Sequence, residues 1–384
     1  MIECSTNIVR LIIERVRFEI FFLGVMRMDE KKATKRIVFL IGGMGKGGAE
    51  RVISILANHY AKKGWEVDIL MLLNNCCEYE LNKNIKITSL CKEGKSRIRQ
   101  LPKWISNIRK YVIENKPDRI VSFVARINII TILSCIGLKQ HIIVSERNDP
   151  ASDGRSIIVR IATRLLYPLA HCVVFQTRWA QSCFSKKIQK KSVIIPNPIQ
   201  VTLQTSKEKK KKIVAVGRLV EQKNHAMLIR AFKRVHYVHP EYKLYIYGEG
   251  DLRDALTKLI QELSLSEAVF LPGKVDNIHE EIADAEMFVL ASNYEGLSNA
   301  LLEAMMIGLP CISTKCAGSN EVINNNHNGI LVNLGSEEEL VKAICALIND
   351  RELAYKLSQN GKKIVESMSA DNVIPKWEQT IEKL

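Results

Sequence analysis

The amino-acid sequence predicts an α/β protein of two Rossmann-like, doubly wound domains. Three observations lead to this fold class. Short apolar runs alternate with helical patterns along the chain, which is typical of parallel sheets covered by helices. Glycine-rich loops follow two of these runs, at 42–48 and at 248–250. The length of 384 residues allows two domains of ordinary size.

The first half of the chain opens with a βαβ pattern. A buried strand is expected at 36–41, a helix from Ala49 to about Lys62 that ends at Gly64, and a strand at 65–73. Further strands are expected at 118–123, 142–145, 172–176 and 193–195. Prolines 196 and 198 then interrupt regular structure, and the highly charged run 206–212 is interpreted as part of an interdomain linker.

The second half repeats the alternation. Strands are expected at 213–216, 244–247, 269–271 and 287–291, with a helix from about His225 to Val235 after the first of them. The last helices lie between Glu337 and the C-terminus, the final one around 375–384.

The stretch 293–310 is the most informative part of the chain. A turn at Glu295 follows a buried strand, a helix begins near Ser298, and Gly308-Leu309-Pro310 ends that helix. Ser298 or Asn299 is expected to cap it. Ligands of open α/β sheets bind at the carboxyl ends of strands, and a helix N-terminus favours anions. The alternative is that Glu295 is a turn residue and Glu303 lies on a solvated helix face.

The glycine loop 42–48 does not form a Walker A motif, because Leu40 replaces its leading glycine and Gly47 follows Lys46. Gly43, Gly45 and Gly48 fit Gly-x-Gly-x-x-Gly, but the next strand ends without the acidic residue of a dinucleotide site. The loop permits close backbone approach, with free N–H groups at the start of the next helix. A plain tight turn is the alternative.

The run Tyr-Glu-Gly-x6-Glu-Ala-Met-x2-Gly-Leu-Pro, which contains Glu295 and Glu303, resembles the retaining glycosyltransferases of family 4. These enzymes have the GT-B fold, in which two domains face each other across a cleft, and the resemblance extends from about Arg36 to the end. It looks closest to bacterial enzymes of capsule, lipopolysaccharide or lipid-linked oligosaccharide synthesis. The implied organisation is an N-terminal extension 1–32, an acceptor-binding domain 33–198, a linker 199–212, a nucleotide-sugar-binding domain 213–370, and a helix 371–384 that crosses back to the first domain.

The resemblance also implies site residues. Arg218 and Lys223, in Gly-Arg-Leu-x3-Lys, would bind the donor diphosphate and act in catalysis with Glu295, and Glu303 would bind the ribose. The other implied donor-binding residues are Gly217, Gly248, Gly250, Gly296, Leu297 and Ser298, the last three through backbone N–H groups. Gly47, Gly48 and Arg147 would lie on the acceptor side of the cleft.

One departure from the family pattern limits what the resemblance implies. Many family members carry a histidine near positions where this chain has Ser122 and Glu146-Arg147, so no catalytic histidine is assigned. For Arg147 an ordinary surface salt bridge is an equal alternative to an anionic ligand. No metal or other cofactor is expected, because no metal-ligand motif occurs and two cations would neutralise the diphosphate.

The expected function is transfer of a hexose or N-acetylhexosamine, with retention, from a nucleotide-sugar to a saccharide or lipid-linked saccharide. UDP is favoured by resemblance only, and N-acetylhexosamine, galactose and mannose donors all stay open. Two alternatives are a nucleotide-sugar epimerase of the same fold and a catalytically silent scaffold that binds nucleotide or membrane. A nicotinamide oxidoreductase is disfavoured, because the glycine loop lacks its acidic partner.

The net charge of +15 indicates a polyanionic partner. The basic segment 92–110 surrounds Trp104 and suits an anionic membrane surface, whereas no nucleic-acid recognition motif accompanies the charge. No run of eighteen apolar residues occurs, and the ten cysteines are scattered, as in a reducing compartment. The expected location is therefore cytoplasmic, with peripheral contact at the inner face of the plasma membrane left open.

The N-terminal segment 1–32 has three interpretations. A start at Met26 or Met28 is slightly favoured over a membrane-touching amphipathic helix and over an extra packed helix.

Overall fold

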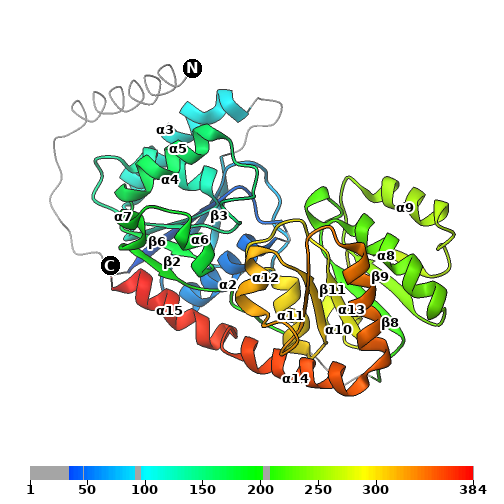
Figure 1. Ribbon diagram of the computed structural model, residues 1–384. Coiled ribbons are helices and arrows are strands. Elements are labelled where there is room, and N and C mark those ends of the chain that lie inside the picture. Colours follow the sequence, from blue (N-terminus) through cyan, green and yellow to red (C-terminus); the bar gives the residue numbers. More distant parts are fainter. Residues whose placement is uncertain (1–33, 46, 91–96, 202–207, 384) are drawn as a thin grey trace.

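The computed structural model describes residues 34–45, 47–90, 97–201 and 208–383, and side chains from residue 100 onward in the third range. The first domain holds a parallel sheet in the order β3-β2-β1-β4-β5-β6-β7 (Figure 1). Its strands are β1 (Arg36–Ile41), β2 (Glu66–Met71), β3 (Lys86–Ser89), β4 (Arg119–Phe123), β5 (His141–Ser145), β6 (Cys172–Phe175) and β7 (Ser192–Ile194). Its helices are α2 (Gly48–Lys62), α3 (Arg97–Asn115), α4 (Ala125–Cys135), α5 (Ile157–Leu166), the 3-10 turn η1 (Tyr167–Leu169), α6 (Arg178–Ser182) and α7 (Lys186–Gln189).

The second domain holds a parallel sheet in the order β10-β9-β8-β11-β12-β13. Its strands are β8 (Lys212–Val216), β9 (Lys243–Tyr247), β10 (Val269–Gly273), β11 (Met287–Leu290), β12 (Cys311–Thr314) and β13 (Ile330–Val332). Its helices are η2 (Glu221–Lys223), α8 (His225–Val238), α9 (Arg253–Glu262), α10 (Ile278–Ile282), α11 (Asn299–Ile307), α12 (Ala317–Val322), α13 (Glu337–Asn349) and α14 (Arg351–Glu366), followed by α15 (Ala370–Glu382).

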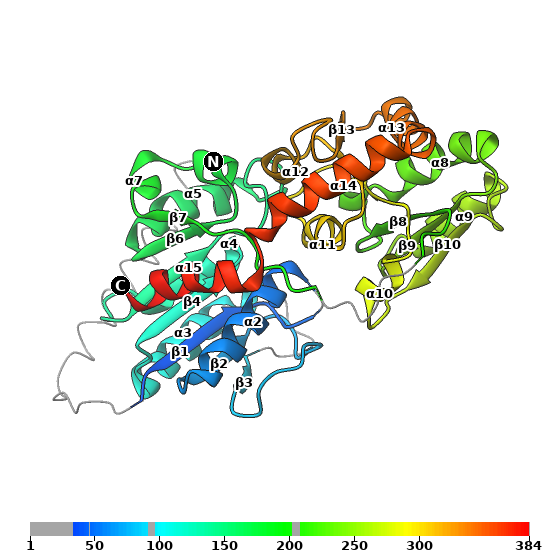
Figure 2. The same ribbon diagram turned by 90° about the horizontal axis from the view of Figure 1, so that it is seen from below.

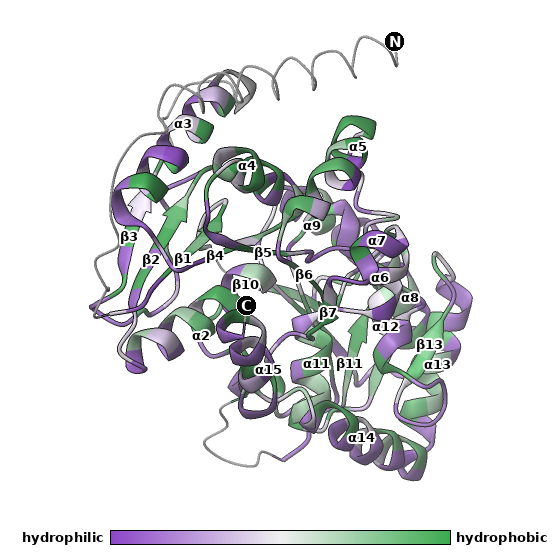
Figure 3. Cartoon of the chain, turned by 90° about the vertical axis from the view of Figure 1, so that its left-hand side faces the viewer, coloured by the Kyte–Doolittle hydropathy of each residue, from purple (hydrophilic) through white to green (hydrophobic). Residues whose placement is uncertain are grey.

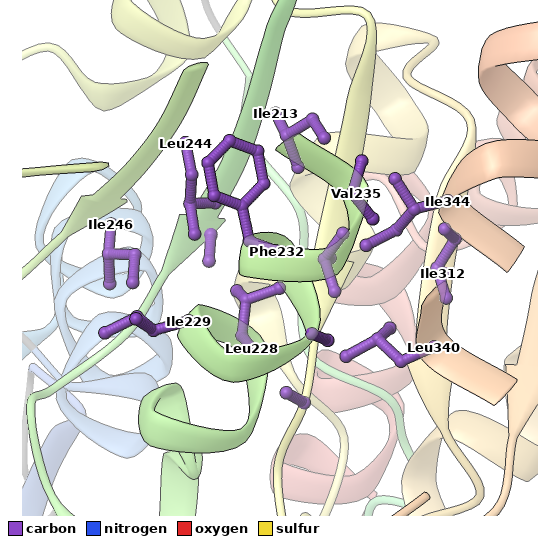
Figure 4. Close-up of a cluster of buried hydrophobic side chains, with 14 of the residues drawn as sticks. Ile213, Leu228, Ile229, Phe232, Val235, Leu244, Ile246, Ile312, Leu340 and Ile344 are labelled. Atoms are coloured by element: carbon purple, nitrogen blue, oxygen red, sulfur yellow. The ribbon is translucent and has the colours of Figure 1, made fainter. Parts of the chain in front are cut away.

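Each sheet reverses its strand order at one place, between β1 and β4 and between β8 and β11. Helices cover both faces, so the central strands are apolar along most of their length, and 37–41 is fully buried. In the second domain, α8 and α13 pack side chains such as Phe232 and Ile344 against Ile213 and Leu244 (Figure 4). The predicted α/β class with two doubly wound domains is therefore confirmed.

The C-terminal helices join the two domains. In Figures 1 and 2, α14 lies under the second domain and α15 continues beneath the first. Trp377 of α15 is fully buried and stacks on Phe123, with 5.8 Å between ring centroids. Glu378 accepts hydrogen bonds from Lys63 at 2.6 Å and His59 at 2.9 Å. The last helix begins at Ala370 and runs through Pro375, so the range 375–384 begins too late, whereas the range 371–384 starts one residue after the observed first residue.

Other expectations differ in detail or lie outside the description. The short strands β3, β12 and β13 were not predicted. Ile199, inside the predicted linker, pairs with the segment after α14 through hydrogen bonds to Met368 and Ala370, each 2.8 Å long. Residues 202–207 of that linker and the whole extension 1–32 lie outside the described residues. Among the helices that the structure does describe, none combines the length and the apolar character needed to span a bilayer.

Candidate functional site

The order reversal of the second sheet brings Lys223 to Glu295. Lys223 ends the loop after β8, and Glu295 lies in the loop after the neighbouring strand β11. The Lys223 ammonium forms an ion pair with Glu295 Oε1, which also accepts a hydrogen bond from the Ser292 hydroxyl at 3.0 Å. Both charged side chains are mostly buried. A cation is thus held where ligands of such sheets bind.

Arg218 lies on the same loop but is exposed. Its charge acts on Glu50, at the N-terminus of α2 in the first domain. Gly217 leaves room for the lysine, because a Cβ there would lie 3.1 Å from Lys223 Cδ and Cε. Two cations therefore line this loop, one paired and one facing the first domain.

Gly248 and Gly250 allow two loops to touch. Gly248 has φ +140°, and a Cβ on it would overlap the Gly217 carbonyl oxygen. A Cβ on Gly250 would overlap the Leu219 backbone. These glycines support the loop that carries Arg218 and Lys223 from beneath, which is a reason for glycine independent of any ligand.

Glu303 is buried between the domains, so the interpretation as a solvated helix face is wrong. It forms an ion pair with Arg51 of α2, and its Oε2 lies 3.2 Å from His279 Nε2. Burial, and then the Arg51 charge, lowers the pKa of His279 to about 4. The neutral imidazole therefore donates a hydrogen bond to the carboxylate at pH 7. Arg51 and His279 were not among the predicted site residues.

The loop 295–298 packs against the first domain. A Cβ on Gly296 would lie 2.8 Å from Gln176 Oε1 and 3.0 Å from the Arg147 carbonyl oxygen. The Leu297 N–H donates to Gln176 Oε1 at 3.3 Å, and the Leu297 carbonyl accepts from Asn197 Nδ2 at 3.0 Å. The Leu297 N–H is therefore bonded to Gln176 in this structure, and its predicted contact with a phosphate stays a prediction.

Ser298 is the N-cap residue of α11, but its side chain makes no capping hydrogen bond, and Asn299 is the first helical residue. The predicted capping interaction is wrong. The Asn299 side chain instead accepts a hydrogen bond from Asn197, and it lies 3.6 Å from where a Cβ on Gly48 would be. Tertiary contacts across the domain boundary have replaced the local cap.

Arg147 is buried, so a surface salt bridge is ruled out. Its guanidinium lies over the rings of Phe123 and Trp377, at 4.8 and 5.3 Å from their centroids, and donates to Asn197 Oδ1 at 2.8 Å. Burial lowers its pKa to about 9. Arg147 thus ties the end of β5 to α15 and to Asn197.

Gly47 is the N-cap residue of α2 and Gly48 its first residue, one position before the expected start at Ala49, but the N-terminus of this helix is not open. The Glu50 carboxylate folds back over Gly47 and accepts from the N–H groups of Ala49 and Glu50 itself. Burial raises the pKa of Glu50 against the opposing effects of these bonds and of Arg218. A carboxylate of the chain therefore occupies the predicted anion site.

A pocket of about 500 Å³ lies between α6 and α12, lined by Arg178, Trp179, Ala317, Asn320 and Glu321. Trp179 is half exposed, and its Nε1 donates to Asp149 at 3.1 Å. Asp149, Glu295 and Lys223 all act electrostatically on the Cys316 thiol next to Ala317. Helix α12 connects the pocket to the loop that carries Glu295, because the Gly318 N–H donates to the Glu295 carbonyl at 3.3 Å. Trp179 and Asp149 were not among the predicted site residues.

Trp104 is not at a membrane interface. It is buried under β3, and its Nε1 donates to the Leu90 carbonyl at 3.3 Å. Arg109 also points inward, to the carbonyls of Ser134 and Ile136. The interpretation of this segment as a membrane surface is wrong for these residues, and Lys92 and Lys95 lie outside the described residues. Within the described ranges, no group of three metal-ligand side chains occurs.

Comparison with known proteins gives consistent results. Residues 46–203 match the family described as Glycosyltransferase Family 4, and residues 202–364 match Glycosyl transferases group 1. A Campylobacter jejuni N-acetylgalactosamine-N,N'-diacetylbacillosaminyl-diphospho-undecaprenol 4-alpha-N-acetylgalactosaminyltransferase is 30% identical over 84% of this chain and 93% of its own length. A second N-acetylgalactosaminyltransferase of that organism, also named for an undecaprenol-linked saccharide, is 28% identical over 89% and 97%.

The solved structure of Anabaena HepE with UDP and glucose superposes with a TM-score of 0.79 at 17% identity, covering 91% of this chain and 100% of that one. Sucrose-phosphate synthase from Thermosynechococcus elongatus gives a TM-score of 0.77 at 18% identity, covering 90% and 98%. At these identities the two structures establish the similarity of fold.

Proposed function

Because this chain belongs to the glycosyltransferases of family 4, we propose that it transfers a hexose or N-acetylhexosamine from a UDP-sugar to a lipid-linked saccharide, with retention. The names of the two Campylobacter relatives support an undecaprenol-linked acceptor, and the UDP bound to HepE supports the nucleotide. The transfer reaction would take place on the cytoplasmic side of the membrane that contains such an acceptor.

The observation that carries this proposal is the placement of Lys223 and Arg218 on one loop at the order reversal of the second sheet. Negative charge builds up on a nucleotide diphosphate as its bond to the sugar breaks. A preorganised cation that stabilises such charge contributes about 10²- to 10³-fold in rate. Lys223 would leave its ion pair with Glu295 and bind the diphosphate instead. Arg218 would bind the same diphosphate from the solvent-exposed side of the loop.

In the proposed reaction, the bond between the anomeric carbon and the β-phosphate oxygen breaks, and the nucleotide diphosphate leaves with the electron pair. The acceptor hydroxyl forms the new bond on the same face, and its proton passes to the leaving phosphate oxygen. Glu303 would accept hydrogen bonds from the ribose hydroxyls and share its charge with Arg51. The two cations would neutralise the diphosphate without a divalent metal ion.

The pocket between α6 and α12 is proposed to hold the acceptor saccharide. Trp179 offers an exposed ring for stacking on a sugar, and Asp149 holds that ring in place. Asn320 and Glu321 supply amide and carboxylate groups for sugar hydroxyls. The acceptor would thereby reach the transferred sugar from the first domain.

The donor site is tested by thermal shift with a panel of UDP- and GDP-sugars. Wild type is compared with Arg218→Ala/Lys223→Ala and with the control Lys233→Ala/Arg234→Ala, which removes two exposed cations from α8. A donor at 100 times its Kd stabilises by about 2.7 kcal/mol. We expect UDP-sugars to stabilise wild type and control, with at least a tenfold loss of affinity in the double variant. Equal responses of all three proteins would refute the assignment.

The acceptor site and the stereochemistry are tested by transfer to a lipid-linked saccharide. Trp179→Ala should raise the acceptor KM by about tenfold, the effect of losing one stacking ring, and leave the donor affinity unchanged. NMR of the product should show the same anomeric configuration as the donor. Conversion of donor to an epimer without acceptor would identify an epimerase instead.

A further inference from the structure

Helix α5 lies at the outer edge of the first domain, and much of it has the colour of hydrophobic residues in Figure 3. Several of these apolar side chains are exposed and form a stripe. Ile157 is 75% exposed, Ile158 63% and Leu165 52%, and Leu169 of the following turn η1 is 54% exposed. With the half-buried Ile161, the three helical residues fall within about 100° of arc on one face. Four of the large exposed apolar side chains in the described residues thus fall within thirteen consecutive positions.

Cations flank this stripe, and acidic residues are missing from its segment. Arg160 and Arg164 lie along one side of it on α5, and α7, which packs against η1, exposes Lys186, Lys187 and Lys190. The sequence from 154 to 207 contains nine Lys and Arg residues and no Asp or Glu. The stripe and the cations around it, here called the α5 surface, therefore combine exposed aliphatic groups with a positive field.

The α5 surface is rigidly connected to the proposed site. Arg155, just before α5, is buried and bonded to Glu146 and Asp153 at 2.8 and 2.7 Å. Glu146 directly follows β5, and Asp149 of the same loop holds Trp179 at the pocket. Whatever the α5 surface binds is thus held at a constant distance from the pocket.

We propose that the α5 surface docks the protein on an anionic lipid membrane. Aliphatic side chains on one face of a helix with arginines and lysines beside them are the pattern of a helix that lies in the lipid interface. Each exposed cation adds an electrostatic attraction to anionic headgroups, and salt weakens this attraction by screening. This inference goes beyond the proposed function, because it assigns the surface that brings the pocket to its lipid-linked acceptor.

A protein partner would match the α5 surface less well than a membrane does. A stable protein interface uses about 20–30 residues on each side, with few charges at its centre. The stripe offers four apolar residues on a helix of ten and one on the following turn, surrounded by charges of one sign. An extended anionic surface matches both its size and its charge.

The test is sedimentation of the full-length protein with phosphatidylcholine vesicles that contain 0 or about 30% phosphatidylglycerol, at low and high salt. The variants are Ile157→Ser/Ile158→Ser for the stripe and Arg164→Gln/Lys186→Gln/Lys187→Gln for the charge. The matched control is Tyr237→Ser/Val238→Ser on α8, where these residues are 88% and 64% exposed. Transfer to a soluble saccharide acceptor is measured in parallel.

We expect wild type and control to bind the anionic vesicles with equal affinity, and at least about tenfold more tightly than the neutral ones. Both α5-surface variants should lose about tenfold or more in vesicle affinity, while transfer to the soluble acceptor is unchanged. Equal vesicle binding by the isoleucine variant and the control would overturn the proposal. So would a wild-type dimer that the isoleucine variant converts to a monomer, since the stripe would then bind a second copy. Neither outcome would bear on the donor site.

Discussion

His279 should make the stability of the second domain depend on pH through its buried contact with Glu303. Its pKa is lowered from 6.5 to about 4, first by burial and then by Arg51. An unfolded chain takes up the proton near pH 6.5, whereas the folded protein resists it until about pH 4. Stability is therefore fully present above pH 6.5 and is lost as the pH falls from 6.5 toward 4.

The size of the effect follows from these two pKa values. A shift of one unit corresponds to about 1.4 kcal/mol, so the full difference is about 3 kcal/mol, and about 2 kcal/mol of it is lost by pH 5. For a domain of this size, 2 kcal/mol lowers Tm by about 4–8 °C. The Glu280 carboxylate opposes the shift, but burial and the Arg51 charge outweigh it.

The assay compares wild type with His279→Gln by urea unfolding between pH 7.5 and pH 5. Glutamine keeps a hydrogen-bond donor for Glu303 but does not titrate. The buried His225, whose pKa is also lowered to about 4 by burial and by Lys223, is present in both proteins and cancels. We expect wild type to lose about 2 kcal/mol more than the variant on going to pH 5. Parallel curves would show that folded His279 is protonated beside Glu303 and would refute the reasoning.

Three further predictions concern the site and its support. Gly248→Ala should lower the free energy of unfolding by about 3 kcal/mol or more and weaken donor binding about tenfold, because the new Cβ would overlap the Gly217 carbonyl. The control Gly335→Ala, at φ +73° with open space around it, should lower the free energy of unfolding by only about 1 kcal/mol. Similar losses in the two variants would contradict this account. Trp377→Ala should lower the free energy of unfolding, measured with denaturant, by about 3–5 kcal/mol, because it leaves a cavity where α15 packs on β4. The control Tyr355→Ala, at an exposed position, should lower it by less than about 1 kcal/mol. A small loss in Trp377→Ala would show that α15 contributes little to stability. EDTA should leave the transfer rate within about twofold, and a large loss restored by Mg²⁺ would refute charge neutralisation by Arg218 and Lys223 alone.

Periodicity and loop composition were sufficient to predict the fold class. Buried parallel strands are continuous apolar runs, and such runs are visible locally at 36–41 and 287–290. The Gly-Arg-Leu-x3-Lys and Glu-x7-Glu patterns also located the two loops that the second sheet brings together. The strands β3, β12 and β13 were not predicted. In β3 the sequence Lys-Ile-Thr-Ser lacks the continuous apolar run of a buried strand, because this edge strand is largely exposed.

The partners of the site residues depend on contacts between distant segments. Arg51 reaches Glu303 across 252 positions of sequence, and Asn197 reaches Leu297 across 100. No local pattern specifies such a pair, since each residue alone is equally compatible with solvent exposure. The same holds for Trp104, which had the composition of an interfacial residue but is buried.

The sequence by itself therefore determined the two parallel sheets, the carboxyl-end loops and the cations at 218 and 223, because these follow from local periodicity and spacing. Only the tertiary structure decided that Glu50 fills the N-terminus of α2, that Arg147 lies over two aromatic rings, and that the apolar stripe of α5 is exposed. Burial, pairing and exposure are properties of what packs against a residue, and the packing partners come from elsewhere in the chain.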